Sequence, residues 1–379
     1  MEQHDITDRR WMEEALALAR DAIGLSEPNP RVGCVIVSAD GARVLGRGHT
    51  QARGGAHAEV MALRDAAAAG TDVRGATAFV TLEPCAHHGR TGPCCDALAA
   101  AGLGRVVAAA QDPNPLVAGQ GFARLRAAGV EVSVGPCAAA ARDLNVGFFS
   151  RMERGRPWVR MKVAASLDGV TALDNGASQW ITSPEARADG HAWRARAGAV
   201  LTGIGTVLED NPRLDVRLVP TPRQPDLVLV DSRLQLPLDA ALFAPAGRGL
   251  LVYFAERQPA REAALAARGA TLVQTANAGG KVALDAMLQD LAAREVNELH
   301  VEAGHKLNGS LLREGLVDEL LVYLAPALLG AGRPMAAFGP LGQLADRLEL
   351  AFLSADRVGP DLRIRATRTV QSAHAPSVA

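Results

Sequence analysis

Strong charge of one sign, long apolar runs and an even set of cysteines are all missing from this sequence of 379 residues. Its 40 basic and 41 acidic residues nearly cancel, so the chain lacks the positive field that collects nucleic acid. The longest apolar run, about 320–332, contains Pro326 and is shorter than the ~20 residues that span a membrane. We therefore expect neither nucleic acid nor a membrane as a partner.

Cysteine is scarce and unevenly placed. Five cysteines all lie within the first 140 residues, namely Cys34, Cys85, Cys94, Cys95 and Cys137. The first residues of the chain are charged, unlike a secretory signal, and an odd number of cysteines in such a chain argues against a disulfide framework. We expect a cytoplasmic protein whose thiols are reduced and partly available as metal ligands. Lysine is scarcer still, because only Lys162, Lys281 and Lys306 occur.

Length and hydrophobic spacing predict two α/β domains. In the first half, helices are expected at 12–23, 58–69, 93–101 and 121–128, and strands at 32–39, 43–49, 76–82, 105–110 and 130–134. In the second half, helices are expected at 184–197, 259–267 and 281–293, and strands at 158–165, 198–203, 226–231, 249–254, 270–274, 297–302, 317–325, 348–353 and 361–368. Ser183 and Pro184 have the pattern of an N-cap followed by proline at the first helical position.

The boundary between the two domains is expected in the segment 145–157. This segment has arginines and glycines, and Pro157 opens a new strand pattern. We place the domains at 1–148 and 149–379. The small, polar tail from about residue 370 is expected to be disordered.

The strongest chemical pattern is His57-Ala58-Glu59 followed by Pro84-Cys85 and Pro93-Cys94. One imidazole and two thiolates are a ligand set that zinc accepts while leaving its fourth position to water. His57 starts a predicted helix, and each cysteine follows a proline at or near a predicted helix start, where thiolates are stabilised. Glu59, two residues beyond His57, is placed to move protons between water, a ring nitrogen and departing ammonia.

Other interpretations of these residues remain open. A closed zinc site would take Cys95 or His87 as its fourth ligand, and buried cysteines without a metal are a third possibility. Cys34 lies in an apolar strand and is expected in the core. Cys137 follows a proline but stands alone after a strand.

The first half resembles the deaminase half of the bifunctional deaminase/reductase family of riboflavin biosynthesis. The resemblance rests on Asn29-Pro30-Arg31-Val32-Gly33, on His57-Ala58-Glu59 and on the stretch from Pro84 to Cys94. Eight residues separate the two cysteines, whereas nucleoside and nucleic-acid deaminases of this fold usually have two. Gly92 departs from the family, which usually has a proline there.

The resemblance implies a cytidine-deaminase-like three-layer α/β domain that holds Zn²⁺ with His57, Cys85 and Cys94. Glu59 would be the proton shuttle, and Asn29 would lie near the pyrimidine, unless it is only a turn residue before proline. His87 and Arg90 would contact the base or the substrate phosphate, or else stabilise their loop.

The second half resembles the reductase half of the same family. The motifs are Lys162 to Gly169, Ser178 to Arg187, Gly205 to Pro212 and Val301 to Gly304. They imply a dihydrofolate-reductase-like α/β domain that uses NADPH. The implied NADPH-binding residues are Ala164, Trp180, Thr206, Asp210, Ser232, Gly304, His305, Lys306, Leu307, Asn308, Gly309 and Ser310. The implied substrate-binding residues are Asn29 in the first half and Lys162, Ser178, Arg194, Leu214, Arg217 and Glu302 in the second.

The residue chemistry agrees with several of these roles. Arginine suits a phosphate because its fork donates two parallel hydrogen bonds, and Glu302 can accept hydrogen bonds from sugar hydroxyls. Lys162 is expected to bind the ribose or to supply a proton. The alternative interpretation of Trp180 is a residue of the core. That of Arg194 is a solvated residue on a helix. Arg233 is a candidate for the cofactor 2′-phosphate.

These observations predict a bifunctional cytoplasmic enzyme acting on a small phosphorylated pyrimidine. The first domain would deaminate 2,5-diamino-6-ribosylamino-4(3H)-pyrimidinone 5′-phosphate, and the second would reduce the ribosyl group to ribityl with NADPH. We expect a homo-oligomer. Two other hypotheses are a zinc deaminase of a nucleoside or tRNA base with a non-catalytic second domain, and a structural zinc protein with a nucleotide-sensing domain.

Overall fold

The computed structural model describes residues 2–87, 92–115 and 117–369. The expected disorder of the tail from about 370 lies outside these residues. The chain divides into two compact units, Met1–Arg156 and Pro157–Ala379. The expected boundary at 148/149 lies inside a helix of the first unit, α6 (Val146–Arg154). Among the described residues, none of the helices has the length and apolar character that crossing a membrane requires.

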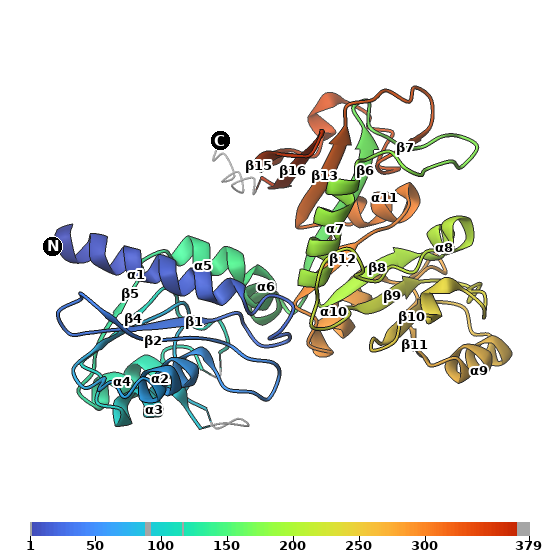
Figure 1. Cartoon of the computed structure of the whole chain (residues 1–379). Coiled ribbons are helices and arrows are strands. Elements are labelled where there is room, and N and C mark those ends of the chain that lie inside the picture. The colour runs from blue at the N-terminus through green and yellow to red at the C-terminus, as the bar shows by residue number, and fades with distance from the viewer. Residues whose placement is uncertain (1, 88–91, 116, 370–379) are drawn as a thin grey trace, which may run out of the picture. The chain divides into compact units, whose positions relative to one another are not determined.

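Unit 1 is a mixed five-stranded sheet between two helical layers, in the strand order β2-β1-β3-β4-β5 (Figure 1). Its strands are β1 (Gly33–Val37), β2 (Val44–His49), β3 (Thr77–Val80), β4 (Arg105–Ala108) and β5 (Glu131–Val134). Its helices, besides α6, are α1 (Glu2–Arg20), α2 (Ala58–Ala68), α3 (Cys94–Ala100), α4 (Gln120–Ala127) and α5 (Ala138–Leu144). The pair β1–β2 and the pair β1–β3 are antiparallel, and the remaining pairs are parallel.

Alternation along the strands makes the three layers. On β1, Cys34 and Ile36 face a core shared with α2, α3, α4 and α6, whereas Val35 and Val37 face a second core under α1 and α5, as the period of two requires. Gly33 lets α1 touch the sheet, because a Cβ there would stand 1.9 Å from the Ala15 carbonyl oxygen. The three-layer prediction is confirmed.

Unit 2 is built on a nine-stranded sheet in the order β11-β10-β9-β8-β12-β6-β13-β16-β15. Its strands are β6 (Trp158–Ser166), β8 (Ala199–Gly203), β9 (Asp226–Val230), β10 (Leu250–Phe254), β11 (Ala270–Gln274), β12 (Glu298–Val301), β13 (Glu319–Ala325), β15 (Leu350–Val358) and β16 (Asp361–Arg368). All pairs are parallel except β13–β16 and β16–β15. A separate two-stranded sheet joins β7 (Val170–Ala172) to β14 (Arg333–Pro334).

The helices of unit 2 are α7 (Pro184–Arg196), α8 (Ile204–Asp210), α9 (Pro259–Ala267), α10 (Leu284–Ala293) and α11 (His305–Arg313), with short 3₁₀ turns at Ala241–Phe243 and Leu344–Asp346. The predicted cap of α7 is confirmed, because the Ser183 side chain accepts a hydrogen bond from the Ala186 N–H. The expected mixed α/β reductase fold is confirmed as well.

A buried ion cluster lies at the amino ends of β6, β12 and β13. Arg160 is 1% exposed, and it pairs with Glu298 at 2.7 Å and with Glu319 at 2.9 Å. Arg160 also stacks on the ring of Trp193 at 4.5 Å, and the Trp158 indole N–H donates to Glu319 at 3.0 Å. Buried charges are tolerated only when they are paired in this way.

Candidate active sites

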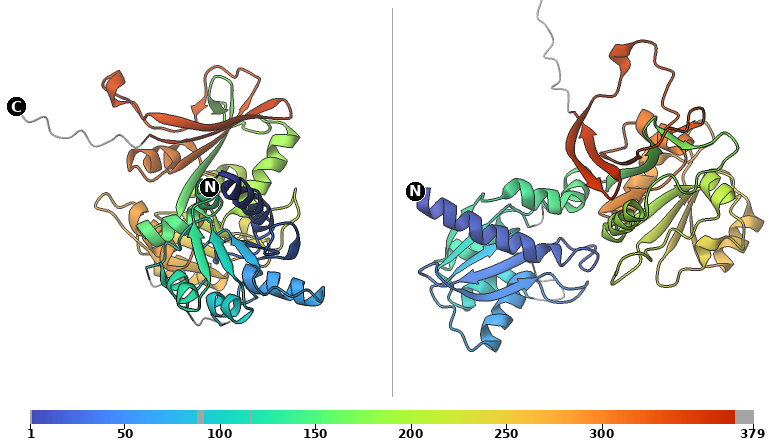
Figure 2. Two further views of the ribbon diagram at one scale, coloured as in Figure 1. Left: turned by 90° about the vertical axis from the view of Figure 1, so that its left-hand side faces the viewer. Right: turned by 45° about the horizontal axis from the view of Figure 1, so that its top comes forward.

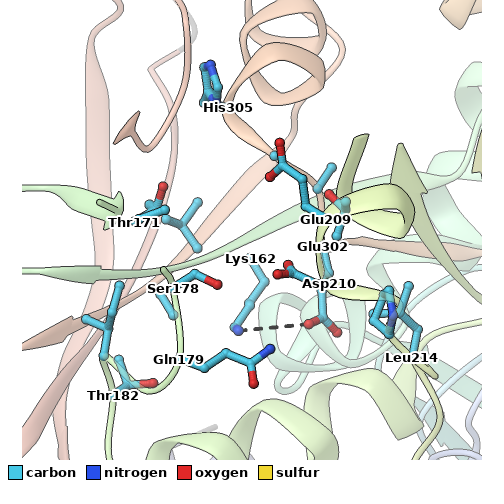
Figure 3. Close-up of a pocket in the computed structure, with 18 of the residues that line it drawn as sticks. Lys162, Thr171, Ser178, Gln179, Thr182, Glu209, Asp210, Leu214, Glu302 and His305 are labelled. Carbon is cyan, nitrogen blue, oxygen red and sulfur yellow. Dashed lines mark ion pairs between the residues drawn. The ribbon is translucent and has the colours of Figure 1, made fainter. Parts of the chain in front are cut away.

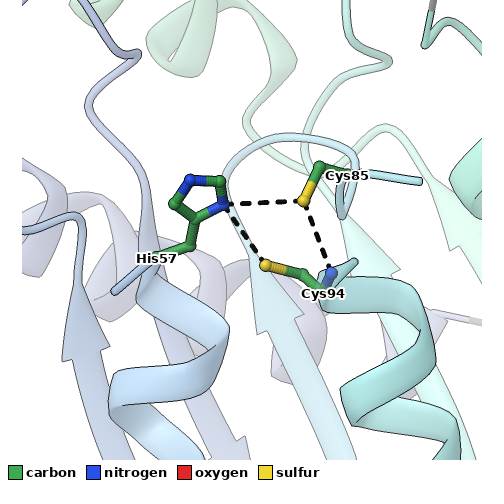
Figure 4. A group of neighbouring side chains, drawn as sticks. All are labelled: His57, Cys85 and Cys94. Atoms are coloured by element: carbon green, nitrogen blue, oxygen red, sulfur yellow. Dashed lines mark hydrogen bonds between the residues drawn. The ribbon is translucent and has the colours of Figure 1, made fainter. Parts of the chain in front are cut away.

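Three predicted ligands converge in unit 1 (Figure 4). His57 is the N-cap of α2, Cys85 lies in the loop after β3, and Cys94 is the first residue of α3. The His57 Nδ1 lies 3.5 Å from the Cys85 Sγ and 3.3 Å from the Cys94 Sγ. Ligand atoms on a tetrahedral zinc ion, with bonds of 2.0–2.3 Å, stand about 3.5 Å apart. The residues therefore fit Zn²⁺ before any rearrangement.

The described part of unit 1 supplies three ligand atoms to this cluster and no fourth. Among the described residues, His57, Cys85 and Cys94 are the full set of potential ligand atoms that cluster here. The Cys95 thiol instead donates to Asp96 at 3.4 Å, and His87 is exposed outside the cluster. The alternative of a closed site through Cys95 or His87 is thus not supported by the geometry.

Glu59 lies beside this cluster in the first turn of α2. Its carboxyl group is 3% exposed and interacts with the Cys94 thiol. Burial and the neighbouring Cys85 raise the pKa of Glu59 to about 7. A carboxyl group in such a setting exchanges protons near neutral pH, which is what a proton shuttle requires.

The remaining cysteines lie apart from the metal site. Cys34 is fully buried in the core of unit 1, as expected. Cys137 is the N-cap of α5, and its sulfur lies 4.0 Å from the Arg9 carbonyl oxygen. Neither belongs to the ligand cluster.

The predicted substrate residue Asn29 sits in a tight turn. Its N–H donates to the Ser26 carbonyl oxygen at 2.8 Å, and its own carbonyl accepts from the Ser26 hydroxyl at 3.1 Å. The backbone of Asn29 therefore forms the turn, and its side chain remains available to a ligand. His87 is exposed, and Arg90 lies outside the described residues.

Glu83 is a site-building residue that sequence reasoning missed. Its buried carboxylate accepts hydrogen bonds from the backbone N–H groups of Asp112, Gly119, Gly121 and Phe122, at 2.9–3.3 Å. It thereby ties the segment between β4 and α4 to the loop that carries Cys85. The only sequence signal was its position two residues before that ligand.

In unit 2, a cavity of about 440 Å³ opens over the carboxyl ends of β6, β8 and β12 (Figure 3). It gathers thirteen predicted residues from distant segments. These are Lys162, Ala164, Ser178, Trp180, Arg194, Thr206, Asp210, Leu214, Arg217, Glu302, Gly304, His305 and Asn308. The cavity is also lined by residues that were not predicted, among them Thr171, Gln179, Thr182, Arg187, Glu209, Arg213 and Arg333.

Five predicted cofactor residues do not line this cavity: Ser232, Lys306, Leu307, Gly309 and Ser310. The last four belong to α11, of which His305 and Asn308 line the cavity together with Gly304, the residue before the helix. Leu307 packs against the core, and a Cβ on Gly309 would meet the Ala337 carbonyl oxygen at 2.3 Å. The whole stretch 304–310 was expected to line the NADPH site, but a helix with 3.6 residues per turn presents only part of its residues to one side.

Glu302 is the electrostatic centre of the cavity. Its Oε1 and Oε2 accept hydrogen bonds from the Arg194 Nε at 2.7 Å and Nη2 at 3.0 Å. The Lys162 Nζ lies 3.9 Å from its Oε2. Burial opposes ionisation of Glu302, but Arg194, His300 and Lys162 hold its pKa well below the usual range. Burial lowers the pKa of Lys162, against the opposing charge of Glu302.

Exposure decides between the alternatives for three residues. Arg194 is 7% exposed and paired, so it is not a solvated helix residue. Trp180 is 65% exposed, with the Arg187 guanidinium over its ring at 4.5 Å, so it is not a core residue. Arg233 pairs with Glu256 at 3.8 Å away from the cavity.

Comparison with known proteins gives each unit a class. Residues 5–110 match the family model of the cytidine and deoxycytidylate deaminase zinc-binding region, and residues 157–364 match that of the RibD C-terminal domain. The fold and the two sites therefore define a bifunctional enzyme, a zinc-dependent deaminase joined to an NADPH-dependent reductase.

Relatives that match almost the whole chain identify the family within this class of enzymes. The riboflavin biosynthesis protein RibD of Escherichia coli is 44% identical over 94% of this chain and 98% of its own. That of Aquifex aeolicus is 38% identical over 94% and 97%. The solved structure of Acinetobacter baumannii RibD, form 1, is 41% identical, with a TM-score of 0.86 over 96% of this chain and 99% of its own. The chain belongs to the RibD family of riboflavin biosynthesis proteins.

Proposed function

We propose that unit 1 hydrolytically deaminates 2,5-diamino-6-ribosylamino-4(3H)-pyrimidinone 5′-phosphate and that unit 2 then reduces its ribosyl group to ribityl with NADPH. The observation that carries the proposal is the presence, on one chain, of the three-ligand zinc cluster and the Glu302 cavity. A solved relative from Thermotoga maritima, 30% identical with a TM-score of 0.85, is described as a diaminohydroxyphosphoribosylaminopyrimidine deaminase/5-amino-6-(5-phosphoribosylamino)uracil reductase.

In unit 1, the three zinc ligands and Glu59 have different roles. When bound, zinc lowers the pKa of a water molecule and so supplies a nucleophile at neutral pH. The Glu59 carboxylate takes one proton from water and gives it to the ring nitrogen. It then takes the second proton from the hydroxyl group on the attacked carbon and gives it to the departing amino group. One water is consumed and one ammonia is released, while the amino-bearing carbon becomes a carbonyl. Asn29, on its fixed turn, orients the pyrimidine.

In unit 2, the side chains prepare the ribose for a hydride supplied by NADPH. Reduction breaks the bond between C1′ and the ring oxygen, with the hydride going to C1′ and a proton to the oxygen. Lys162 supplies that proton, since its half-buried ammonium group lies 3.9 Å from Glu302. Glu302 accepts hydrogen bonds from the ribose hydroxyls. Arg217, which lines the cavity, binds the 5′-phosphate.

The positions of the predicted cofactor residues fit an extended dinucleotide. Thr206 lies in α8, directly after β8, while Gly304 follows β12 and Ser232 follows β9. These three strands are parallel neighbours, so their carboxyl ends meet at one edge of the sheet, where ligands of such sheets bind. NADPH would run along this edge from the Lys162 cavity toward Ser232. The placement of Ser232 outside the cavity is consistent with that path.

Two assays on the purified protein test this function. The diaminopyrimidine phosphate is added first and ammonia release is measured, then NADPH is added and its absorbance is followed. We expect ammonia first and NADPH oxidation only afterwards. Ammonia without NADPH oxidation would refute the reductase and favour a deaminase with a non-catalytic second unit. Neither signal, in protein shown to contain zinc, would favour the structural zinc protein.

We also propose a cytoplasmic homo-oligomer that binds neither nucleic acid nor membranes. Support comes from the ribbon of β15 and β16, where β15 is the edge strand of the nine-stranded sheet (Figure 2). Phe352 and Leu353 on β15 are 76% and 49% exposed. An exposed apolar edge strand favours pairing with another chain, and a second copy is the partner we propose.

A further inference from the structure

One buried histidine in unit 2 has a position that the reaction described above does not use. His300 lies on β12, two residues after Glu298 and two residues before Glu302, which directly follows the strand. Alternate residues of a strand share a face, so these three side chains lie on one face of the sheet. β12 pairs with β6 in a register that sets His300 opposite Arg160 and Val301 opposite Met161. The next pair along the same register brings Glu302 beside Lys162.

His300 is completely buried and lacks a good partner. Its exposed fraction is 0%, and neither ring nitrogen has a hydrogen-bond partner among the residues that the structure describes. An unpaired polar group in such a place is costly to folding. The Glu302 Oε1 lies 3.5 Å from the His300 Nε2. The imidazole is therefore one small adjustment away from a hydrogen bond to the central carboxylate of the cavity.

Three side chains from three elements approach Glu302. Arg194 holds both carboxylate oxygens from α7, and Lys162 approaches Oε2 from β6. His300 approaches Oε1 along the strand itself. A carboxylate that must face both an ammonium group and a substrate benefits from donors that fix its rotation.

This inference rests on the proposed reductase function. We propose that His300 is a positioning residue whose neutral imidazole donates from Nε2 to Oε1 of Glu302 and keeps that carboxylate turned toward Lys162 and the ribose. The charged groups that act on His300 are Arg160 from β6, Arg194 from α7 and Glu302, which directly follows β12. Glu298 lies two residues before His300 on the same strand. Burial and the two arginines keep the imidazole neutral, since they lower its pKa against the pull of Glu302.

Two substitutions distinguish the effect of the hydrogen-bond donor of His300 from the effect of its side-chain volume. His300→Gln retains an amide N–H near the position of Nε2, whereas His300→Met fills a similar volume without a donor. We expect His300→Met to lower the reductase kcat by about tenfold or more, and His300→Gln to restore most of it. NADPH affinity by titration calorimetry and ammonia release by unit 1 should be unchanged in both. Equal losses in the two variants, or a wild-type rate in His300→Met, would overturn the proposal.

A second readout does not depend on turnover. In ¹⁵N-histidine NMR, the signal that disappears in His300→Gln belongs to His300. At about pH 8, where an imidazole with a lowered pKa carries no charge, we expect the neutral tautomer with its proton on Nε2. A protonated ring, or a proton on Nδ1 alone, would overturn the proposal. Should the wild-type protein fail to oxidise NADPH, the reductase assignment fails, and this spectrum still decides whether His300 can donate to Glu302.

Discussion

Asn145 and Arg31, 114 residues apart in the chain, exchange two hydrogen bonds. The Asn145 Oδ1 accepts from the Arg31 N–H at 2.7 Å, and its Nδ2 donates to the Arg31 carbonyl oxygen at 2.8 Å. Both residues are buried. Arg31 follows the turn that carries Asn29, so an asparagine between α5 and α6 sets the position of a candidate substrate segment.

Removing this amide should destabilise unit 1. Asn145→Ala leaves the Arg31 N–H and carbonyl without their partner, and we expect a loss of about 2 kcal/mol in the free energy of unfolding. Chemical denaturation followed by circular dichroism measures it. Glu153→Ala, which breaks an exposed ion pair with Arg142 on α5, is the control and should cost less than about 0.5 kcal/mol. Equal effects would contradict the assigned role.

Metal binding should distinguish two adjacent cysteines. Cys94→Ser removes a ligand, and we expect zinc content and ammonia release to fall together while NADPH-dependent reduction of the deaminated substrate continues. Cys95→Ser is the matched control, because that thiol contacts Asp96 rather than the cluster, and it should retain zinc. Elemental analysis of the purified proteins checks both. Loss of zinc in Cys95→Ser would make it a fourth ligand.

Glu59 should be needed for turnover and dispensable for the metal. Glu59→Gln keeps the size of the side chain and removes its acid–base function, so we expect ammonia release to fall by at least about a hundredfold. Zinc content should remain at the wild-type level, since Glu59 is not among the clustered ligand atoms. A variant that loses its zinc would show that the glutamate is structural.

Acid should weaken unit 2 partly through His191. Its Nδ1 accepts a hydrogen bond from the Arg217 N–H at 3.1 Å, and burial, together with Arg194 and Arg217, lowers the pKa of His191 to about 4. The unfolded chain therefore binds this proton first, and stability that is complete above pH 6.5 is lost as the pH falls toward 4. The loss is at most about 1.4 kcal/mol per pH unit.

His191→Asn tests this dependence, because the amide oxygen can replace Nδ1 as acceptor and does not titrate. Calorimetric unfolding at pH 7 and pH 5 should show a smaller loss of stability in the variant than in the wild type. Other titrating groups are common to both proteins and cancel in the comparison. The same loss in both would exclude His191 as the source.

The exposed ribbon should control assembly. Phe352→Glu places a charge at an exposed apolar position of the edge strand β15, and we expect it to shift the protein toward the monomer in sedimentation analysis. Leu328→Glu is a comparison, since Leu328 is 72% exposed but lies outside β15 and β16. A wild-type monomer would refute the oligomer, and an equal shift in both variants would refute the role of the ribbon.

Much of the fold follows from local patterns, because its strands are apolar and its helices begin and end at ordinary signals. The predicted strands 226–231 and 270–274 differ from β9 and β11 by at most one residue. The segment 145–157 contains the division between the two units, which follows Arg156, but its arginines and glycines conceal α6, whose Phe148 and Phe149 pack into the core. Sequence composition does not reveal such burial.

The site residues likewise include some that the sequence predicts and some that it does not. His57, Cys85 and Cys94 were found because each has a strong chemical identity and stands at the start of a helix or in a loop. Glu83 was missed because its partners are backbone groups some 30 to 40 residues away in the chain. Arg333 and Arg213 were missed because only the tertiary fold brings them to the cavity.

The partly exposed indole of Trp180 gives this enzyme an intrinsic fluorescence signal. Its ring stands at the cavity with 65% of its surface in solvent, while Trp158 and Trp193 sit in the ion cluster at the opposite ends of the strands. Nicotinamide bound beside Trp180 would quench its emission and leave the other three tryptophans, Trp11, Trp158 and Trp193, as an internal reference. Occupancy of the reductase site can therefore be followed without a label and without turnover.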